Sequence, residues 1–200
     1  MSADPQRIAL ADADVRYQPD WLPEAAADVL LRALIDEIRW TQHHVRIFGR
    51  ELPSPRLSAW IGDPGAAYTY SRVRHEPLPW TPTLALLRSR LHVEFGIDFN
   101  SVLANRYRDG RDSMGWHADD EPELGPEPVI ASVSLGATRQ MRFRSRAAGA
   151  QGSIALALEH GSLLRMAGGT QQHYQHAISK TRASVGERIN LTFRVLLSAL

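Results

Sequence analysis

Residues 101–125 read SVLANRYRDGRDSMGWHADDEPELG, a strand-like segment followed by a turn and an acidic loop. Ser101–Tyr107 has the pattern of a strand, and RDGRD has the composition of a turn. Further on, His117 stands two residues before Asp119. Because side chains two apart on a strand point to the same side, we expect these two to face one point while Ala118 points away.

A histidine and a carboxylate that face one point suit a divalent first-row metal ion. A second histidine would complete the two-histidine, one-carboxylate face of non-heme Fe(II) oxygenases, which leaves positions open for a cosubstrate and dioxygen. A lone His-x-Asp pair has low specificity, because most such pairs are surface residues. The candidates for the third ligand are His160, which lies in a predicted turn, His173 and His176. Ligand chemistry alone does not separate His173 from His176.

The last predicted strand carries an unusual polar face. In ERINLTFRVLL, residues 187–197, the alternation places four polar side chains on one side: Arg188, Asn190, Thr192 and Arg194. Two arginines and an amide are costly to bury without anionic partners. The face is therefore either solvated or part of a pocket for a dicarboxylate, whose geometry matches the arginine fork.

The rest of the chain after Gly96 also has a β pattern, broken by turn sequences such as LGAT, EHGS and AGGT. We expect further strands at Val129–Leu135, Gln140–Arg144, Ile154–Leu158, Ser162–Met166 and Ile189–Leu197. Many short strands after two early helices predict an α+β fold with a β-sandwich or jelly-roll core.

Two segments before these strands have a helical pattern. In residues 19–40 the apolar side chains of Leu30, Leu34 and Ile38 share one face, with Asp20 as the expected cap and Pro23 in the first turn. Residues 81–96, TPTLALLRSRLHVEFG, have a proline suited to the first helical position and a glycine suited to the end. Residues 44–77 between the helices have no helical period, and we expect strands and loops that form a surface feature.

Composition limits the class of protein. The 200 residues suffice for one domain with a core, and the net charge of +1 does not by itself indicate a nucleic-acid binder. The absence of cysteine excludes disulfides, thiolate metal sites and cysteine nucleophiles. No apolar run approaches the roughly 20 residues of a membrane helix, and the N-terminal residues lack a secretory pattern. We expect a cytoplasmic monomer that does not associate with membranes.

Several motifs in order resemble the AlkB-type Fe(II)/2-oxoglutarate-dependent dioxygenases, a family of nucleic-acid dealkylases. The resemblance covers roughly residues 45–195 and rests on PRLSAWIGD, YTYS, NRY, GWHADDEPELG, ASVSLGATRQMRFR, HGSLLRMAGGTQQHYQH and RINLTFR. HADDEPELG, and PRLSAW followed by YTYS, resemble the animal repair branch more than the founding bacterial enzyme.

The resemblance implies a set of site residues. It makes His117, Asp119 and His176 the iron ligands, and so decides against His173. In the NRY motif, Asn105 and Tyr107 match the cosubstrate contacts of the family. The RxNxxxR signature for 2-oxoglutarate corresponds to Arg188, Asn190 and Arg194, where the family pattern assigns Arg188 to the distal carboxylate and Arg194 to the one at the metal.

The resemblance also implies an activity. We expect a double-stranded β-helix (jelly-roll) core with two N-terminal supporting helices, a lead-in at residues 1–20 and a single dioxygenase domain at residues 21–200. Residues 45–80 would form a nucleotide-recognition lid. With Fe(II), O2 and 2-oxoglutarate, the enzyme would demethylate 1-methyladenine and 3-methylcytosine in single- or double-stranded DNA, with RNA as an open alternative. Formaldehyde, succinate and CO2 would be released.

A base must leave its stack to reach such a site, and the pocket that receives it needs aromatic walls. Trp60, Tyr68 and Tyr70 are candidates, and core packing is the alternative for each. The predicted substrate contacts are Phe48, Arg56, Trp60, Tyr68, Tyr70, Ser71, Asp120 and Glu121.

Two features suggest how a methylated base would be selected. Asp120 and Glu121 would favour a cationic base, unless they belong to a solvated loop. Phe48 would act as a wedge in duplex DNA, unless it packs in a hairpin core. The arginines of residues 44–77 would offer phosphate contacts.

Two other functions remain open at this stage. The same iron chemistry could hydroxylate or demethylate a protein or a small molecule. Alternatively, the chain could be a noncatalytic nucleic-acid-binding module with a relic metal site, although the presence of every ligand argues against this.

Overall fold

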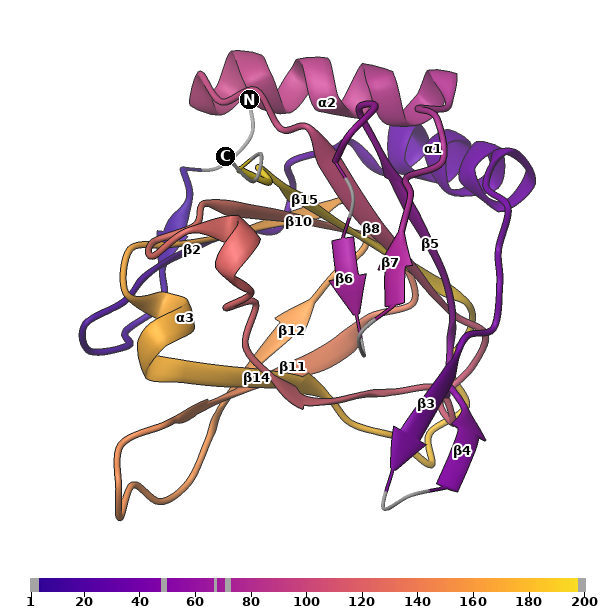
Figure 1. The fold of residues 1–200 in the computed structure, drawn as a ribbon. Helices are drawn as coiled ribbons and strands as arrows, with labels where there is room; N and C mark the ends of the chain where they lie inside the picture. The colour runs from indigo at the N-terminus through magenta and orange to yellow at the C-terminus, as the bar shows by residue number, and fades with distance from the viewer. Residues whose placement is uncertain (1–3, 48–49, 67, 71–72, 198–200) are drawn as a thin grey trace.

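Two antiparallel sheets face each other in the computed structural model, which describes residues 4–47, 50–66, 68–70 and 73–197, with side chains at 45–50 and 67–75 left out (Figure 1). The larger sheet has seven strands in the order β1-β2-β13-β10-β15-β8-β5, and the smaller has four in the order β12-β11-β14-β9. In both sheets, most neighbouring strands are not consecutive in the sequence. This arrangement confirms the predicted α+β class with a jelly-roll core.

The strands of the larger sheet are β1 (Gln6–Arg7), β2 (Asp14–Gln18), β5 (Leu57–Gly62), β8 (Ser101–Tyr107), β10 (Ile130–Gly136), β13 (Ser162–Ala167) and β15 (Arg188–Arg194). Those of the smaller sheet are β9 (Met114–His117), β11 (Arg139–Ser145), β12 (Ile154–Leu158) and β14 (Tyr174–Ile178). Two separate ribbons pair β3 (His44–Ile47) with β4 (Arg50–Pro53) and β6 (Tyr68–Tyr70) with β7 (Val73–His75).

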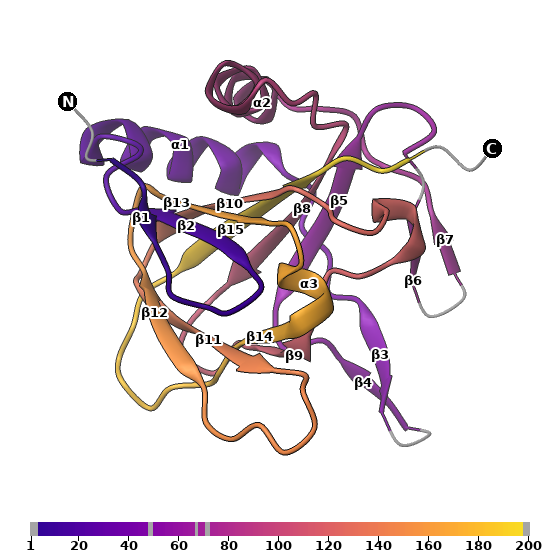
Figure 2. The same ribbon diagram turned by 90° about the vertical axis from the view of Figure 1, so that its left-hand side faces the viewer.

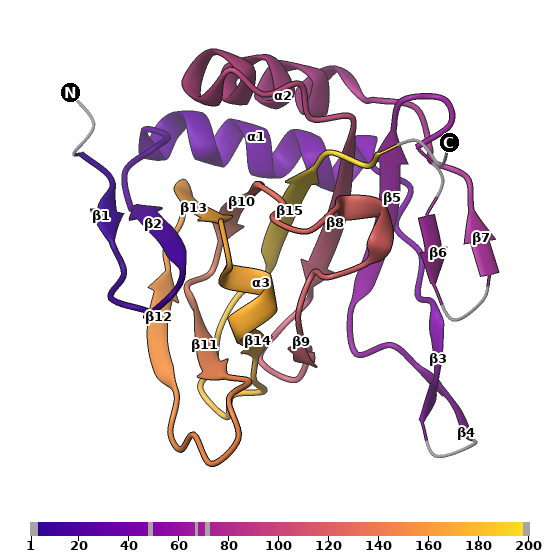
Figure 3. The same cartoon turned by 60° about the vertical axis from the view of Figure 1, so that its left-hand side comes forward.

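Two helices cover the outer face of the larger sheet, as Figures 2 and 3 show: α1 (Glu24–Glu37) and α2 (Pro82–Phe95). The predicted apolar face of α1 is confirmed, since Leu34 and Ile38 are buried in the core and Leu30 packs against it. The same core includes Leu84, Leu87 and Leu91 of α2 together with side chains of β8, β10 and β15. The helices thus leave the opposite face of this sheet to line the space between the sheets.

The predicted ends of α2 are confirmed, and the predicted cap of α1 is wrong. The hydroxyl of Thr81 accepts a hydrogen bond from the Leu84 amide, Pro82 occupies the first turn, and Gly96 ends the helix in the left-handed region. Helix α1 starts after Pro23 without a side-chain cap, and Asp20 is exposed. The prediction placed Pro23 inside the first turn, but the helix starts one residue after it. Asp20 therefore lies too far before the helix to cap it.

Most strand boundaries agree with the sequence prediction to within one residue, and Ser101–Tyr107 and Ile154–Leu158 agree fully. The last strand is shorter than predicted, because the chain leaves the sheet after Arg194 and the Leu196 amide bonds the Asn100 side chain. The short connecting elements η1 (Pro122–Leu124) and α3 (Thr170–His173) and the strand β14 have no counterpart in the prediction.

Residues that precede α1 also belong to the larger sheet. Strand β2 pairs with β13, and its Val15 and Tyr17 side chains are buried in a second core cluster between the two sheets. No helix in the part of the chain that the structure describes is long and apolar enough to cross a membrane.

Gly136 ends β10 at a point where only glycine fits. Its φ is +90°, and a Cβ atom built there would lie 2.3 Å from the Glu187 carbonyl oxygen. We expect Gly136→Ala to lower the free energy of unfolding by about 3 kcal/mol, through both strain and this clash, measured by urea denaturation. Gly149→Ala is the matched control because its φ is +78° with nothing within 4 Å. Equal losses in the two variants would mean that the contact with Glu187 costs nothing.

Candidate metal centre and cosubstrate pocket

Two histidines come together because their strands pair in register. On β9 and β14, His117 lies directly opposite His176, so their side chains are cross-strand neighbours. The ring centroids are 4.2 Å apart with an interplanar angle of 60°. Nδ1 of His117 lies 2.9 Å from the Gly115 carbonyl, which can only accept, so Nδ1 donates and Nε2 is the nitrogen that faces Asp119.

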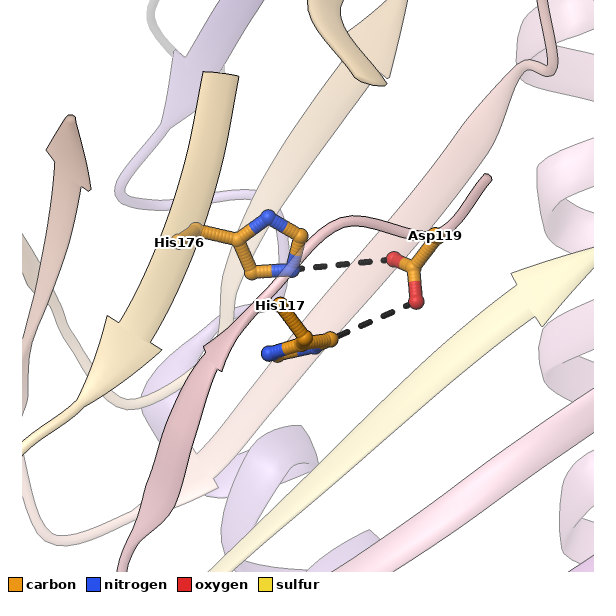
Figure 4. A group of neighbouring side chains, drawn as sticks. All are labelled: His117, Asp119 and His176. Atoms are coloured by element: carbon orange, nitrogen blue, oxygen red, sulfur yellow. Dashed lines mark ion pairs between the residues drawn. The ribbon is translucent and has the colours of Figure 1, made fainter. Parts of the chain in front are cut away.

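Asp119 completes a group of three residues that could hold a metal ion (Figure 4). Its carboxylate oxygens lie 3.7 Å from Nε2 of His176 and 4.0 Å from Nε2 of His117, and the three ligand atoms all lie within 4.8 Å of one another. The predicted convergence holds, but its reason differs from the prediction. Strand β9 ends at His117, so Asp119 lies on the following loop and not on the same strand.

The other two candidate histidines lie elsewhere. His173 is exposed at the end of α3. Nδ1 of His160 accepts from the Gly136 amide at 2.7 Å, and its Nε2 lies 3.4 Å from Asp28. Among the described residues, the two histidines and one carboxylate of the centre therefore come from His117, Asp119 and His176, a donor set that suits a divalent iron.

Buried charges set the protonation of this group. Burial raises the pKa of Asp119, but the charge of Arg194 and its hydrogen bond to the carboxylate outweigh burial and hold the pKa below its usual value. Nη2 of Arg194 also donates to Asp119. Burial, with the nearby His117, lowers the pKa of His176 to about 3. The centre therefore presents a carboxylate and a neutral His176 imidazole, the forms that bind a metal ion.

The three ligands border a pocket between the two sheets. Strand β15 is buried along its whole length, and its register with β8 places Asn190 opposite Asn105 and Arg188 opposite Tyr107. The pocket is lined by Leu103, Asn105, Tyr107, Met114, His117, Asp119, Ser132, Met141, Met166, His176, Ala177, Ile178, Asn190, Thr192 and Arg194. The polar face of the last strand is thus an interior wall, and the solvated alternative is wrong.

Arg188 carries a charge that the described residues do not neutralise. Its side chain is fully buried, Nη2 donates to Ser134 at 3.0 Å, and its Cζ lies 5.1 Å from the centroid of the Tyr107 ring. Nε and Nη1 of Arg188, and Nε of Arg194, have no hydrogen-bond partner among the described residues. Buried guanidinium nitrogens without partners are costly, so these donors fit a carboxylate ligand in the pocket.

Comparison with known proteins identifies the family. The model of the 2OG-Fe(II) oxygenase superfamily matches residues 14–194. The chain belongs to this superfamily. Within it, the chain belongs to the AlkB homologues. It is 40% identical over 183 residues to human "DNA oxidative demethylase ALKBH2", and the match covers 87% of this chain and 70% of the relative.

Two further comparisons agree. The rat "Alpha-ketoglutarate-dependent dioxygenase alkB homolog 3" is 43% identical over 189 residues, and the match covers 89% of this chain and 62% of the relative. The chain therefore spans less than two thirds of that relative. A solved structure described as "The structure of OsALKBH1" shares the fold with a TM-score of 0.64 at 15% identity, covering 96% of this chain and 99% of that one.

The segment that leads into β5 bonds a residue that lines the pocket. Nε of Arg56 donates to Oδ1 of Asn105 at 2.7 Å, so this predicted substrate contact lies beside the predicted cosubstrate contact. The Asn190 amide donates to Ser132 and to the Val133 carbonyl. Asn190 is thus engaged with β10, and the guanidinium groups of Arg188 and Arg194 supply the donors that have no partner in the described part of the chain.

The other predicted substrate residues of this AlkB homologue are placed in different ways. Trp60 is buried with Ala66, Leu124 and Leu196, and its indole donates to the Ala66 carbonyl, as its packing alternative requires. Asp120 is exposed but pairs with Arg146 at 2.7 Å, which offsets part of the predicted negative field. Glu121 follows on the same loop. Tyr68 and Tyr70 lie on β6 with side chains outside the description, and Phe48 and Ser71 lie outside the described residues.

Two residues that touch this site could not be predicted from a local sequence pattern. Gln171, on the four-residue α3, accepts a hydrogen bond from the Asp119 amide, and Arg146 binds both Asp120 and the Gln171 carbonyl. Helix α3, with four residues, is too short to show an apolar period. Arg146 lies 26 residues from its partner Asp120, so no local pattern joins the two. Only the polar run TQQH between Gly169 and Tyr174 marks the place.

We expect Arg188→Met to separate stability from cosubstrate binding. Without ligand, the unfolding free energy should stay within about 1 kcal/mol of the wild type or above it, because a buried guanidinium with unpaired nitrogens is replaced by an apolar chain. With Mn(II) present, 2-oxoglutarate should raise the unfolding temperature of the wild type and not of the variant. Arg142→Met, at an exposed arginine, is the control. A full ligand-induced shift in Arg188→Met would contradict the assignment.

Proposed function

We propose that this protein oxidatively demethylates N-alkylated bases, 1-methyladenine and 3-methylcytosine, in DNA, with RNA as a further substrate class. The observation that supports it most directly is the combined site: two histidines and a buried carboxylate lie beside a pocket lined by Arg194, and the buried Arg188 lies next to the lining residue Tyr107. Both arginines have guanidinium nitrogens without partners among the described residues. A metal ion and a dicarboxylate together match both halves of this site.

In this proposal each residue has a defined task. His117, Asp119 and His176 hold Fe(II), and Arg194 keeps Asp119 ionised and oriented. Arg188 binds the distal carboxylate of 2-oxoglutarate above the Tyr107 ring, with Asn105 and Asn190 on the adjoining wall. When bound, Fe(II), 2-oxoglutarate and O2 supply the oxidation that hydroxylates the N-methyl group, with succinate and CO2 as coproducts and loss of formaldehyde from the base. The two sheets exclude water from the pocket.

Nucleic acid is the proposed substrate for two reasons. The human relative is named a DNA oxidative demethylase. In addition, the outer face of β11 carries the exposed Arg142 and Arg144, and the Cζ of Arg144 lies 4.4 Å from the ring centroid of the half-exposed Trp116, the residue before His117. Arginines beside an aromatic ring suit phosphates and unstacked bases.

The proposed organisation follows the chain. Residues 21–200 form one dioxygenase domain, to whose larger sheet the lead-in adds β1 and β2, and residues 45–80 form the nucleotide-recognition lid. In support, the ribbons β3–β4 and β6–β7 stand apart from both sheets beside β5, as Figures 1 and 3 show. Asp120 and Glu121, on the loop between β9 and η1, favour a cationic methylated base through their negative charge. We also propose a cytoplasmic monomer, which light scattering and localisation of a tagged chain would check.

We expect the wild type, with Fe(II), ascorbate and 2-oxoglutarate, to remove the methyl mass from oligonucleotides carrying 1-methyladenine or 3-methylcytosine, as measured by mass spectrometry. His117→Ala should reduce this to background while the unfolding temperature stays near that of the wild type, because the ring is a ligand on the pocket side and makes few core contacts. His173→Ala, an exposed histidine three residues before His176, should keep full activity.

Unchanged substrate mass in both single- and double-stranded forms would remove nucleic-acid repair as the function. Succinate release that depends on iron but not on methylated oligonucleotide would instead favour a protein or small-molecule substrate. Near-wild-type activity of His117→Ala would show that the metal lies elsewhere.

Phe48, between Arg46 and Arg50, is the proposed wedge for duplex DNA. We expect Phe48→Ala to lower the demethylation rate on double strands more than on single strands, because only a duplex must refill the vacated stack. Leu52→Ala, at an exposed apolar residue of β4, is the control and should leave the ratio of the two rates unchanged. Equal losses on both substrates in Phe48→Ala would assign the residue to packing.

A further inference from the structure

The backbone of Asp119 has to be held by something other than a sheet. Strand β9 ends at His117, and the next regular element, η1, begins at Pro122. Asp119 is nevertheless almost fully buried, with 2% of its surface exposed. A buried amide needs a partner, and a metal carboxylate on an unsupported loop would lose the rigidity that a metal site requires.

Gln171 provides this partner. Its Oε1 accepts a hydrogen bond from the Asp119 backbone amide at 3.0 Å, and its own surface is 1% exposed. The Gln171 Nε2 points to Sδ of Met166 at 3.7 Å, which orients the amide group so that its oxygen faces Asp119. The bond joins two segments that are 52 residues apart in the sequence.

The helix that carries Gln171 is itself fixed. The hydroxyl of Thr170 donates to the Ala167 carbonyl and accepts from the Asp14 amide, which ties α3 to β13 and β2. On the other side, Nη1 of Arg146 donates to both the Gln171 carbonyl and the Asp120 carboxylate. The loop with Asp119 is therefore clamped at two successive residues to one turn of helix.

The same segment leads directly to another ligand. Helix α3 ends at His173, and β14, which starts at Tyr174, carries His176. A displacement of α3 would therefore reach His176 through the chain and Asp119 through the Gln171 hydrogen bond. Without the Gln171 oxygen, the Asp119 backbone amide loses its hydrogen bond to the segment that leads into β14.

We propose that Gln171 is a positioning residue that sets the place of the Asp119 carboxylate relative to His176, through its hydrogen bond to the Asp119 amide. It touches neither metal nor substrate. The inference rests on the proposed function, since it assumes that these side chains bind a metal ion. Groups that orient metal ligands in this way typically change metal affinity by about 10–100-fold when removed.

The test is the affinity of the full-length protein, freed of metal with a chelator, for Co(II), followed by the visible absorption of the bound ion. We expect Gln171→Leu, which keeps the size and loses the acceptor, to raise the Kd for Co(II) about 10–100-fold and to alter the absorption band of the saturated complex. Gln171→Glu keeps an acceptor oxygen and should restore both the Kd and the band toward those of the wild type.

Gln172→Leu is the matched control. This neighbour on α3 is exposed, and its Nε2 donates to the Pro126 carbonyl at 2.7 Å, away from the ligands. It should leave the Co(II) affinity and spectrum unchanged. A general loss of stability in the α3 segment would shift the unfolding temperature of both leucine variants without a selective change in the spectrum.

A wild-type Kd and spectrum in Gln171→Leu would overturn the positioning role while leaving the metal site intact. If Gln171→Leu does not fold, Gln171→Asn retracts the same amide by one methylene, and wild-type binding by that variant would overturn the role equally. Failure of the wild type itself to bind Co(II) would overturn the metal site and therefore the proposed function.

Discussion

The buried ion pair between Arg194 and Asp119 is the interaction on which the centre of this molecule depends. Transfer of either charge from water into the space between two sheets costs several kcal/mol, and only a close partner offsets that cost. The pair lies where the polar face of β15 meets the loop after β9. It fixes the ionised state of the one carboxylate among the three ligands. Arg188, six residues earlier on the same strand, has no carboxylate partner among the described residues, which is why we assign it to an added anion in the proposed function.

The pairing register of the smaller sheet determines the other half of the centre. His117 and His176 meet because β9 and β14 pair directly at these two residues. A slip of one residue would turn either imidazole to the outer face of the sheet, since side chains alternate along a strand. Phe143 of β11 pairs with His176 on the other side and lies fully buried, so the register is also specified by an apolar side chain at the same level.

Much of this could be predicted from the sequence where the pattern is local. The side-chain alternation that predicts β8 and β15 can be read from consecutive residues. Pro82 and Gly96 mark the ends of α2 by their own backbone preferences. The interior position of Arg188 and Arg194 could not be decided locally, because alternation gives a face but not what covers it. The hydrogen bonds that hold the Asp119 loop could not be predicted either, because Gln171 and Arg146 contact this loop only in the tertiary structure. The predicted cap of α1 was wrong because the helix starts after Pro23, later in the chain than expected.

Strand β1 has a consequence for the behaviour of the protein at high concentration. The larger sheet finishes on one side with two residues, Gln6 and Arg7, directly after Pro5, which has no amide hydrogen to donate. A longer unpaired border would offer a row of free donors and acceptors on which a second chain could add a strand. A short terminal strand with a cationic side chain and an adjoining proline leaves little room for such growth. This border of the sheet is therefore protected against aggregation.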